Sequence, residues 1–290
     1  MLRDFISLAR PEQWIKNSIL FAALVFAGVV EDIDRVQNAM LAVAIFCLLS
    51  SAVYTLNDII DREKDRLHPL KKNRPLAAGR VKPGAAFAFM LVPLLIGGVG
   101  AYWLNFDFMI ASVCFVVLNL LYSLLLKNLV ILDAMGVAVS FVIRAFAGAA
   151  AIDVPASKWM LINTLLLALF LSFGKRRHEL TMLEDGASAH RKILDKYSPY
   201  LLDQCIGVTT ASVVVVYMLY TFSPEVSAKL ETENLYLTIP FVVYGVFRYL
   251  YLIHKEERGG SPTRLLISDR PILLTVILWL ITSFSILYIK

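Results

Sequence analysis

Long apolar stretches recur along the whole chain and constrain its fold more than any other feature of the sequence. A helix needs about 20 mostly apolar residues to cross a bilayer, and 58% of the 290 residues are apolar while only 18% are charged. We therefore predict an all-α polytopic membrane protein with nine transmembrane helices, in which residues 1–290 form a single transmembrane domain and little chain is left for a soluble one. The predicted spans are residues 17–31, 37–56, 85–104, 107–126, 129–151, 157–174, 201–221, 234–253 and 271–289.

Lysine and arginine are distributed unevenly between the two sides of this arrangement. With the N-terminus inside, the predicted inner segments hold 22 of the 28 Lys and Arg residues. Because cytoplasmic loops carry an excess of these residues, the three long loops, 57–84, 175–200 and 254–270, are expected in the cytoplasm. Long loops are often functional, so we predict a multi-pass protein of a bacterial-type inner (plasma) membrane with its active site facing the cytoplasm. Anionic lipid accounts for the basic face, and no nucleic acid partner is expected.

A row of polar side chains stands at the end of the second apolar stretch. We call this set the acid row, and it consists of Asn57, Asp58, Asp61 and Asp65. No Gly or Pro interrupts residues 51–66, so we expect one continuous helix in which the three carboxylates share a face, with Tyr54 one turn before them. Like charges so placed cost a helix about 0.2 to 0.5 kcal/mol per pair. A positive group is needed to neutralise them.

Two interpretations of the acid row are open. The first is a solvated helix end whose acids pair with neighbouring Arg and Lys side chains. The second is a metal site, because ionisable groups at a membrane edge are usually functional and because carboxylate and carboxamide oxygens suit Mg²⁺, which shares its shell with substrate phosphates. We favour the second, with Asp58 and Asp61 as catalytic residues, and expect Lys71 and Arg74 to hold phosphate oxygens that the metal leaves free.

The spacing of the acid row, NDxxDxxxD, followed by the basic segment Asn73-Arg-Pro-Leu76, resembles the first signature of the UbiA superfamily of intramembrane transferases. The resemblance covers essentially the whole chain. It implies nine helices around a central cavity with cytoplasmic cap loops, and Mg²⁺ as cofactor. A second set of residues is similar to the superfamily's fifth-span pattern, which implies that they contact substrate in the cavity; they are Tyr122, Lys127, Asp133 and Arg144.

Arg144 is expected deep in the fifth span. A mid-membrane arginine costs at least about 2.5 to 3.5 kcal/mol on insertion scales, so its side chain should face the interior and meet an anion or a backbone carbonyl. Asp133 lies on the same helix face and about 16 Å away along the axis. A structural ion pair between Asp133 and Arg144 is the alternative to a role in substrate binding.

The second inner loop departs from the typical superfamily pattern. Aromatic-acceptor members carry a second acidic row after the sixth span, whereas this sequence has three consecutive cations there, Lys175, Arg176 and Arg177. Taken alone they are ordinary anchors to the inner leaflet. Opposite the acid row they would bind an anionic group directly.

This departure, and the opening RPxQWxKN segment from Arg10 to Asn17, resemble the polyprenyl-phosphate phosphoribosyltransferase branch of the superfamily, as do segments 259–262 and 269–271. The resemblance implies Lys16 and Asn17 as further substrate-binding residues. It also implies transfer of 5-phosphoribosyl from phosphoribosyl diphosphate to a polyprenyl (decaprenyl-type) phosphate lipid, with release of pyrophosphate, to supply a lipid-linked pentose for an arabinan-type polysaccharide of the cell envelope. An anionic acceptor needs no general base, so Mg²⁺ and electrostatic stabilisation would carry the reaction.

Two other functions stay open at this point. One is a UbiA-type prenyltransferase that moves an isoprenoid from its diphosphate to an aromatic acceptor, against which the missing second acidic row argues. The other is a transporter or lipid-binding protein whose acids bind cations without chemistry. The sequence also leaves open the isoprenoid length and whether the chain forms a homo-oligomer.

Overall fold

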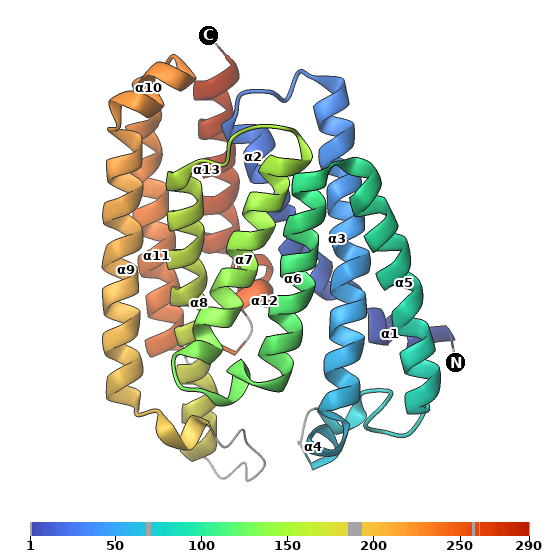
Figure 1. Cartoon of the computed structure of the whole chain (residues 1–290). Helices are drawn as coiled ribbons and strands as arrows, with labels where there is room; N and C mark the ends of the chain where they lie inside the picture. The colour runs from blue at the N-terminus through green and yellow to red at the C-terminus, as the bar shows by residue number, and fades with distance from the viewer. Residues whose placement is uncertain (1, 68–70, 185–192, 257–258, 261, 290) are drawn as a thin grey trace.

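The computed structural model describes residues 2–67, 71–184, 193–256, 259–260 and 262–289 (Figure 1). Within these ranges the secondary structure is helical and contains no strand, which confirms the predicted all-α class. The α-helices are α1 (Leu2–Ala9), α2 (Phe21–Phe26), α3 (Ile33–Ile60), α4 (Arg62–Leu67), α5 (Pro83–Leu104), α6 (Phe106–Leu124), α7 (Leu132–Ala151), α8 (Lys158–Glu184), α9 (Pro199–Thr221), α10 (Pro224–Leu230), α11 (Ile239–His254), α12 (Pro262–Ser268) and α13 (Arg270–Tyr288). The 3₁₀ helices are η1 (Pro11–Leu20), η2 (Lys71–Asn73), η3 (Leu126–Asn128), η4 (Leu194–Lys196) and η5 (Asn234–Thr238).

Eight helices in the described part of the chain are long and apolar enough to cross a membrane, and they match the second to ninth predicted spans. The first predicted span, residues 17–31, is not a single helix. It consists of the end of η1 followed by α2, which ends before a turn at Gly28, where φ is +73°. A 3₁₀ helix rises about 2.0 Å per residue, so η1 and α2 together cover about 29 Å, close to the thickness of the hydrocarbon core.

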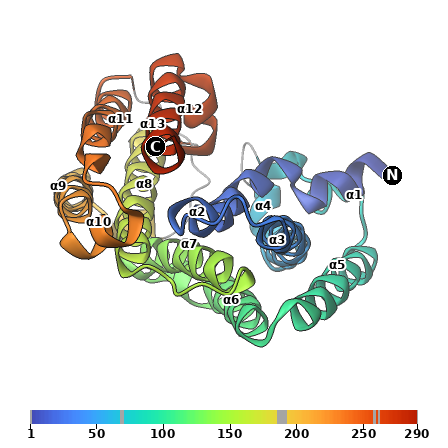
Figure 2. The same ribbon diagram turned by 90° about the horizontal axis from the view of Figure 1, so that it is seen from above.

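The long helices follow one another around an incomplete ring that is open between α13 and α3, and η1 and α2 lie inside it (Figure 2). Each of α3, α5, α6, α7, α8 and α9 packs against the next, and α11 joins α9 to α13. Seen from above, α2 is enclosed by α3, α7 and α13 (Figure 2). The glycine at position 148 permits this packing, because a Cβ there would meet the backbone oxygen of Leu20 at 2.2 Å.

Two helices are longer than the membrane is thick. At 28 and 27 residues, α3 and α8 span about 42 and 40 Å, so each projects beyond a hydrocarbon core of about 30 Å. We call the end of the molecule at which α3 ends, and at which α4 lies, the inner end. The opposite end is the outer end. The acid row therefore stands where α3 leaves the apolar layer.

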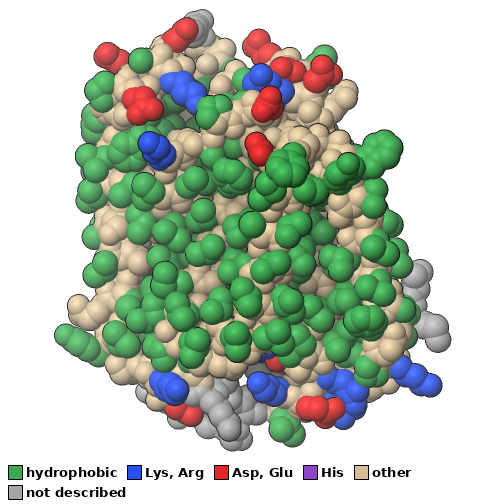
Figure 3. Space-filling model, viewed as in Figure 1, with side chains coloured by type: hydrophobic (Ala, Val, Ile, Leu, Met, Phe, Trp, Pro, Cys, Tyr) green, Lys and Arg blue, Asp and Glu red, His purple; other side chains and the backbone are tan. Residues whose placement is uncertain are grey.

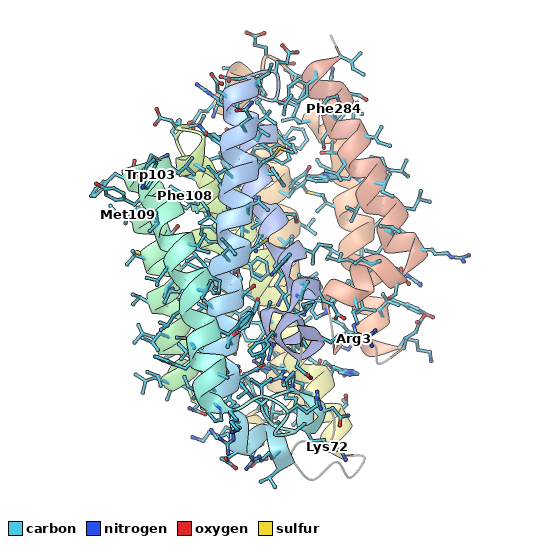
Figure 4. All side chains as sticks on the ribbon, turned by 90° about the vertical axis from the view of Figure 1, so that its right-hand side faces the viewer. Arg3, Lys72, Trp103, Phe108, Met109 and Phe284 are labelled. Carbon is cyan, nitrogen blue, oxygen red and sulfur yellow. The ribbon has the colours of Figure 1, made fainter. Side chains whose placement is uncertain are left out.

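Surface side chains agree with a membrane-spanning body. Charged groups gather at the two ends of the molecule, and the wide band between them is apolar (Figure 3). Trp103, 82% exposed, projects from the surface toward the outer end, and Lys72 lies at the inner end (Figure 4). Tryptophan at the level of the headgroups is typical of membrane interfaces.

The helix that carries the acid row is broken, contrary to the prediction of one continuous helix. Asp61 is the C-cap of α3, with φ −90° and ψ 2°, and α4 begins at the next residue. Across the break, Asp58 of α3 and Asp65 of α4 both contact the same nitrogen of Arg74. Polar contacts of the side chains therefore accompany the bend, although no Gly or Pro is present.

Candidate active site at the inner end

Two arginines neutralise the buried carboxylates of the acid row. Asp58 and Asp65 are 2% and 4% exposed. Nη1 of Arg74 donates to Asp58 Oδ1 at 3.0 Å and to Asp65 Oδ2 at 2.5 Å. Arg10, which precedes η1, also forms an ion pair with Asp58, and its guanidinium lies over the ring of Tyr54 at 5.4 Å. Charges from the N-terminal segment and the first inner loop thus meet at one helix end.

The other two members of the acid row face α6 and η3. Lys127 Nζ lies 2.6 Å from Asp61 Oδ1, and both side chains are largely buried. The hydroxyl of Ser123 donates to Asn57 Oδ1 at 3.2 Å. The fold therefore brings Lys127 to the acid row across 66 positions of sequence. The three carboxylates of the acid row are thus paired with three cations, Arg10, Arg74 and Lys127, so the charges balance.

The oxygen ligands of the acid row determine how a metal ion could be held at this site. Among the described residues, no three His, Cys, Asp or Glu side chains gather closely enough to hold a metal ion together. A cage built from protein alone is therefore not formed there. Mg²⁺, however, is usually held by one or two carboxylates together with waters and substrate phosphates. The hard oxygens of Asp58, Asp61 and Asn57 fit a Mg²⁺ ion that arrives with phosphate groups.

Arg144 lies deeper, inside the ring. It is 3% exposed, and its Nε donates to Asn17 Oδ1 at 2.9 Å. Its Nη1 donates to the carbonyl oxygen of Ser140 at 3.1 Å and to the hydroxyl of Ser140 at 2.7 Å. The expected backbone carbonyl partner is present. The alternative ion pair with Asp133 is not formed, because Asp133 lies nearer the inner end and bonds other groups.

Asp133 belongs to a buried network between α7, α8 and η4. Fully buried, it accepts hydrogen bonds from Arg176 Nε at 2.6 Å and from the hydroxyl of Tyr197 at 2.6 Å. That hydroxyl in turn accepts the backbone N–H of Ile131 at 2.7 Å. Burial and the hydrogen bond to Asp133 raise the pKa of Tyr197, so the phenol keeps its proton at neutral pH. Glu179 is a second partner of Arg176.

The three cations of the second inner loop do not form one cluster, contrary to the expectation. Arg176 points inward to Asp133, whereas Arg177 bonds Asp203 of α9 at 2.5 Å. Lys175 is partly exposed and lies 3.8 Å from Glu179. Successive residues of a helix are about 100° apart, so three consecutive side chains cannot share a face. Of these three side chains, Arg176 is the one that is buried in the protein interior.

The remaining predicted residues lie around this region. Tyr122 packs against Gly136 and is near Arg176. Lys16 stands in η1, near Arg10 and Arg144. Lys71 begins η2, which packs against α4.

Several partners of the predicted residues were absent from the sequence prediction. Arg10 belongs to the quoted opening segment, which was a usable signal. Ser123 follows Tyr122 in the run that resembles the superfamily's fifth-span pattern, which was a second signal. Tyr197 carried none, because its contacts join positions 64 and 66 residues apart.

Comparison with known proteins supports the resemblance drawn from the motifs. Residues 18–268 match the UbiA prenyltransferase family. A decaprenyl-phosphate phosphoribosyltransferase of Mycolicibacterium smegmatis is 31% identical to this chain, covering 99% of it and 93% of the relative. The protein of that name in Corynebacterium glutamicum is 30% identical, covering 98% and 86%.

Solved structures give the same fold. A UbiA homolog from Archaeoglobus fulgidus bound to GPP and Mg²⁺ superposes with a TM-score of 0.74 at 18% identity, covering 98% of this chain and 99% of that one. The digeranylgeranylglyceryl phosphate synthase structure superposes with a TM-score of 0.67 at 18% identity, covering 98% and 99%. The chain is a multi-pass membrane protein that belongs to the UbiA prenyltransferase family.

Proposed function

We propose that this protein transfers 5-phosphoribosyl from phosphoribosyl diphosphate to a polyprenyl phosphate, releasing pyrophosphate. The observation that carries the proposal is the similarity, over nearly the whole length of both chains, to proteins named decaprenyl-phosphate phosphoribosyltransferase. The site geometry agrees with it, because carboxylates and cations are interleaved at one end of the ring. Such a site suits substrates that carry several phosphates.

In this proposal the acid row receives the diphosphate of the donor. Bound there, Mg²⁺ would neutralise the diphosphate and make it a better leaving group. Asn57, Asp58, Asp61 and Asp65 would hold the ion. Each carboxylate is now paired with Arg10, Arg74 or Lys127. With donor and metal bound, these cations would be available to phosphate oxygens and the carboxylates to the metal, so the charges would stay balanced.

The reaction then needs orientation and electrostatic stabilisation more than proton transfer. An oxygen of the lipid phosphate forms the new bond to C1 of the ribose, and the bond from C1 to the diphosphate breaks with its electron pair leaving on pyrophosphate. Arg10, Arg74 and Lys127 stabilise the negative charge that develops on the leaving group. The attacking phosphate is already anionic, so no side chain has to remove a proton.

We also propose that the inner end faces the cytoplasm of a bacterial-type inner membrane. Cytoplasmic loops carry an excess of Lys and Arg, and 22 of the 28 Lys and Arg residues fall in the predicted inner segments. The product would be a lipid-linked pentose for polysaccharide assembly. Residues 1–290 would act as one transmembrane domain.

The direct test is an assay of the purified full-length protein in lipid nanodiscs with Mg²⁺. Phosphoribosyl diphosphate with polyprenyl phosphate should yield pyrophosphate and a phosphoribosylated lipid, detected by mass spectrometry. Omission of the lipid should reduce pyrophosphate release to background. The proposal fails if no phosphoribosylated lipid forms.

Prenyl transfer is the second candidate, favoured by the family match and by the solved homolog bound to GPP. Its test is geranyl diphosphate with 4-hydroxybenzoate under the same conditions. Formation of a prenylated product, with none from the phosphoribosyl donor, would identify a prenyltransferase. Binding of cations without turnover of either substrate pair would instead indicate a transporter or a lipid-binding protein.

A further inference from the structure

Two cations inside the helix ring lack a carboxylate partner among the described residues. Arg144 contacts neutral groups, namely the side-chain oxygen of Asn17, two oxygens of Ser140 and the hydroxyl of Tyr54. Lys16 makes no hydrogen bond or ion pair with any residue in the described ranges. By contrast, Arg10, Arg74 and Lys127 each bond an aspartate.

This arrangement is costly unless an anion completes it. A cation inside a membrane is unfavourable without a counter-charge, and Lys16 lies close enough to Arg144 and Arg10 to be repelled by both. The rings of Phe115 and Phe141, with centroids 4.5 and 5.4 Å from the Arg144 guanidinium, offset part of the cost for that side chain. Lys16 has no comparable ring contact in the described structure.

The depth of the two cations indicates which kind of anion fits. Asn17, the partner of Arg144, also accepts the hydroxyl of Ser50 at 3.4 Å. Ser50 precedes Asp58 on α3 by eight residues, which is about 12 Å along the axis toward the membrane centre. Tyr54 lies between the two levels, because its ring faces Arg10 and its hydroxyl interacts with Arg144. The cations therefore form a second level below the acid row.

The surroundings at that level are apolar. The buried cluster around η1 includes Leu20, Phe46 and Phe115, and it continues toward the outer end. A phosphate with an apolar tail can place its charge beside Lys16 and Arg144 while its chain stays in lipid. The cations available to a soluble sugar phosphate lie nearer the inner end; they are Arg10, Arg74 and Lys127.

We propose that Lys16 and Arg144, with Asn17 and Tyr54, form an anion subsite that holds the phosphate of a polyprenyl phosphate. This assignment rests on the proposed function, in which a lipid phosphate is the acceptor, and it gives each substrate its own level. The donor diphosphate lies at the acid row, and the acceptor phosphate approaches the ribose from the membrane side.

Binding measurements without turnover test this assignment. The full-length protein in nanodiscs is titrated separately with polyprenyl phosphate, with the polyprenol of the same length, and with phosphoribosyl diphosphate plus Mg²⁺. Lys16→Met keeps much of the side-chain volume and removes the charge. It should weaken binding of the lipid phosphate tenfold or more, leave polyprenol binding unchanged, and change donor binding less than twofold.

Matched variants separate the loss of the subsite from a loss of folding. Lys16→Arg keeps the charge and should restore most of the affinity for the lipid phosphate. Lys158→Met removes a lysine at the start of α8, far along the chain from the subsite, and should leave all three affinities unchanged. If Lys16→Met does not fold, Arg144→Lys supplies the test, since it keeps the charge but loses the paired contacts to Asn17 and Ser140.

The contrary outcomes are distinct. Weaker binding of phosphoribosyl diphosphate with unchanged binding of lipid phosphate would assign the subsite to the donor's other phosphate and overturn the proposal. No preference of the wild-type protein for the phosphate over the alcohol would also overturn it. If the wild-type protein transfers no phosphoribosyl group, the proposed function fails, but a preference for lipid phosphate that depends on Lys16 would still support the subsite.

Discussion

At the scale of single residues, the hydroxyl of Tyr197 holds α7, α8 and η4 together through one buried carboxylate. Tyr197→Phe leaves Asp133 without one donor and the N–H of Ile131 without an acceptor. We expect a loss of about 1 to 3 kcal/mol in the free energy of unfolding, measured as a lower unfolding temperature in detergent. Tyr200→Phe, at a position that is 75% exposed, is the control and should leave the unfolding temperature unchanged.

The same hydrogen bond has a defined pH dependence. The pKa of Tyr197 is raised above its ordinary value of 10 by burial and by Asp133. The folded protein therefore keeps the phenolic proton throughout neutral and mildly alkaline pH, and the stabilisation is lost only as pH rises above about 10. The destabilisation by Tyr197→Phe should be equal at pH 6 and pH 9. A marked fall of the difference between these values would contradict the assigned proton.

The acid row gives a prediction about activity. Asp61→Asn keeps the size of the side chain but removes the charge proposed to hold Mg²⁺, and we expect pyrophosphate release to fall by about 10²-fold or more, as for the loss of one strong electrostatic contact in a catalytic site. Asp107→Asn, in the first turn of α6 at the outer end, is the matched control. Full activity of Asp61→Asn would remove this residue from the proposed metal site.

Individual residues also show where prediction from sequence ends. The spacing of Asp58, Asp61 and Asp65 identified the acid row, because such a pattern at a membrane edge is unusual. The pairing of Asp133 with Arg176 instead of Arg144 was not predictable. Both arginines are compatible with the helix pattern, and only the packing of α8 against α7 selects between them.

At the scale of elements, the close approach of η1 to α7 depends on Gly148. In Gly148→Ala the new Cβ would lie 2.2 Å from the carbonyl oxygen and 2.7 Å from the Cα of Leu20. Backbone atoms cannot give way as a side chain can, so we expect a destabilisation of about 1 to 3 kcal/mol or more and a lower unfolding temperature. Gly98→Ala on α5, where a Cβ meets nothing within 4 Å, should be neutral or slightly stabilising.

The elements differ in how far the sequence predicts them. The second to ninth spans were correct, because length and apolarity decide a transmembrane helix. The first was wrong as a single helix, since hydropathy does not distinguish an interior segment of η1 and α2 from a helix that faces lipid. Its contacts with α3 and α7 decide its form, and they follow from packing rather than from periodicity.

At the scale of the whole molecule, the distribution of Lys and Arg predicts the orientation of the protein in the membrane. Lys72 in η2 lies at the inner end (Figure 4), and Lys229 belongs to α10 at the outer end (Figure 1). In a variant without Cys47, Cys114 and Cys205, Lys229→Cys should react with an impermeant thiol reagent in intact cells. Lys72→Cys should react only after the membrane is opened. The reverse pattern would place the acid row outside the cell.

In the proposed function, the acid row holds the diphosphate of a phosphoribosyl donor through Mg²⁺. The most direct measurement is a ligand-bound structure of the full-length protein in nanodiscs, determined by electron cryo-microscopy with Mg²⁺ and phosphoribosyl diphosphate. We expect the diphosphate and a metal ion beside Asp58 and Asp61, with Arg10, Arg74 and Lys127 on phosphate oxygens and the ribose toward Tyr54. A donor bound elsewhere, with the acid row still paired to these cations, would contradict it.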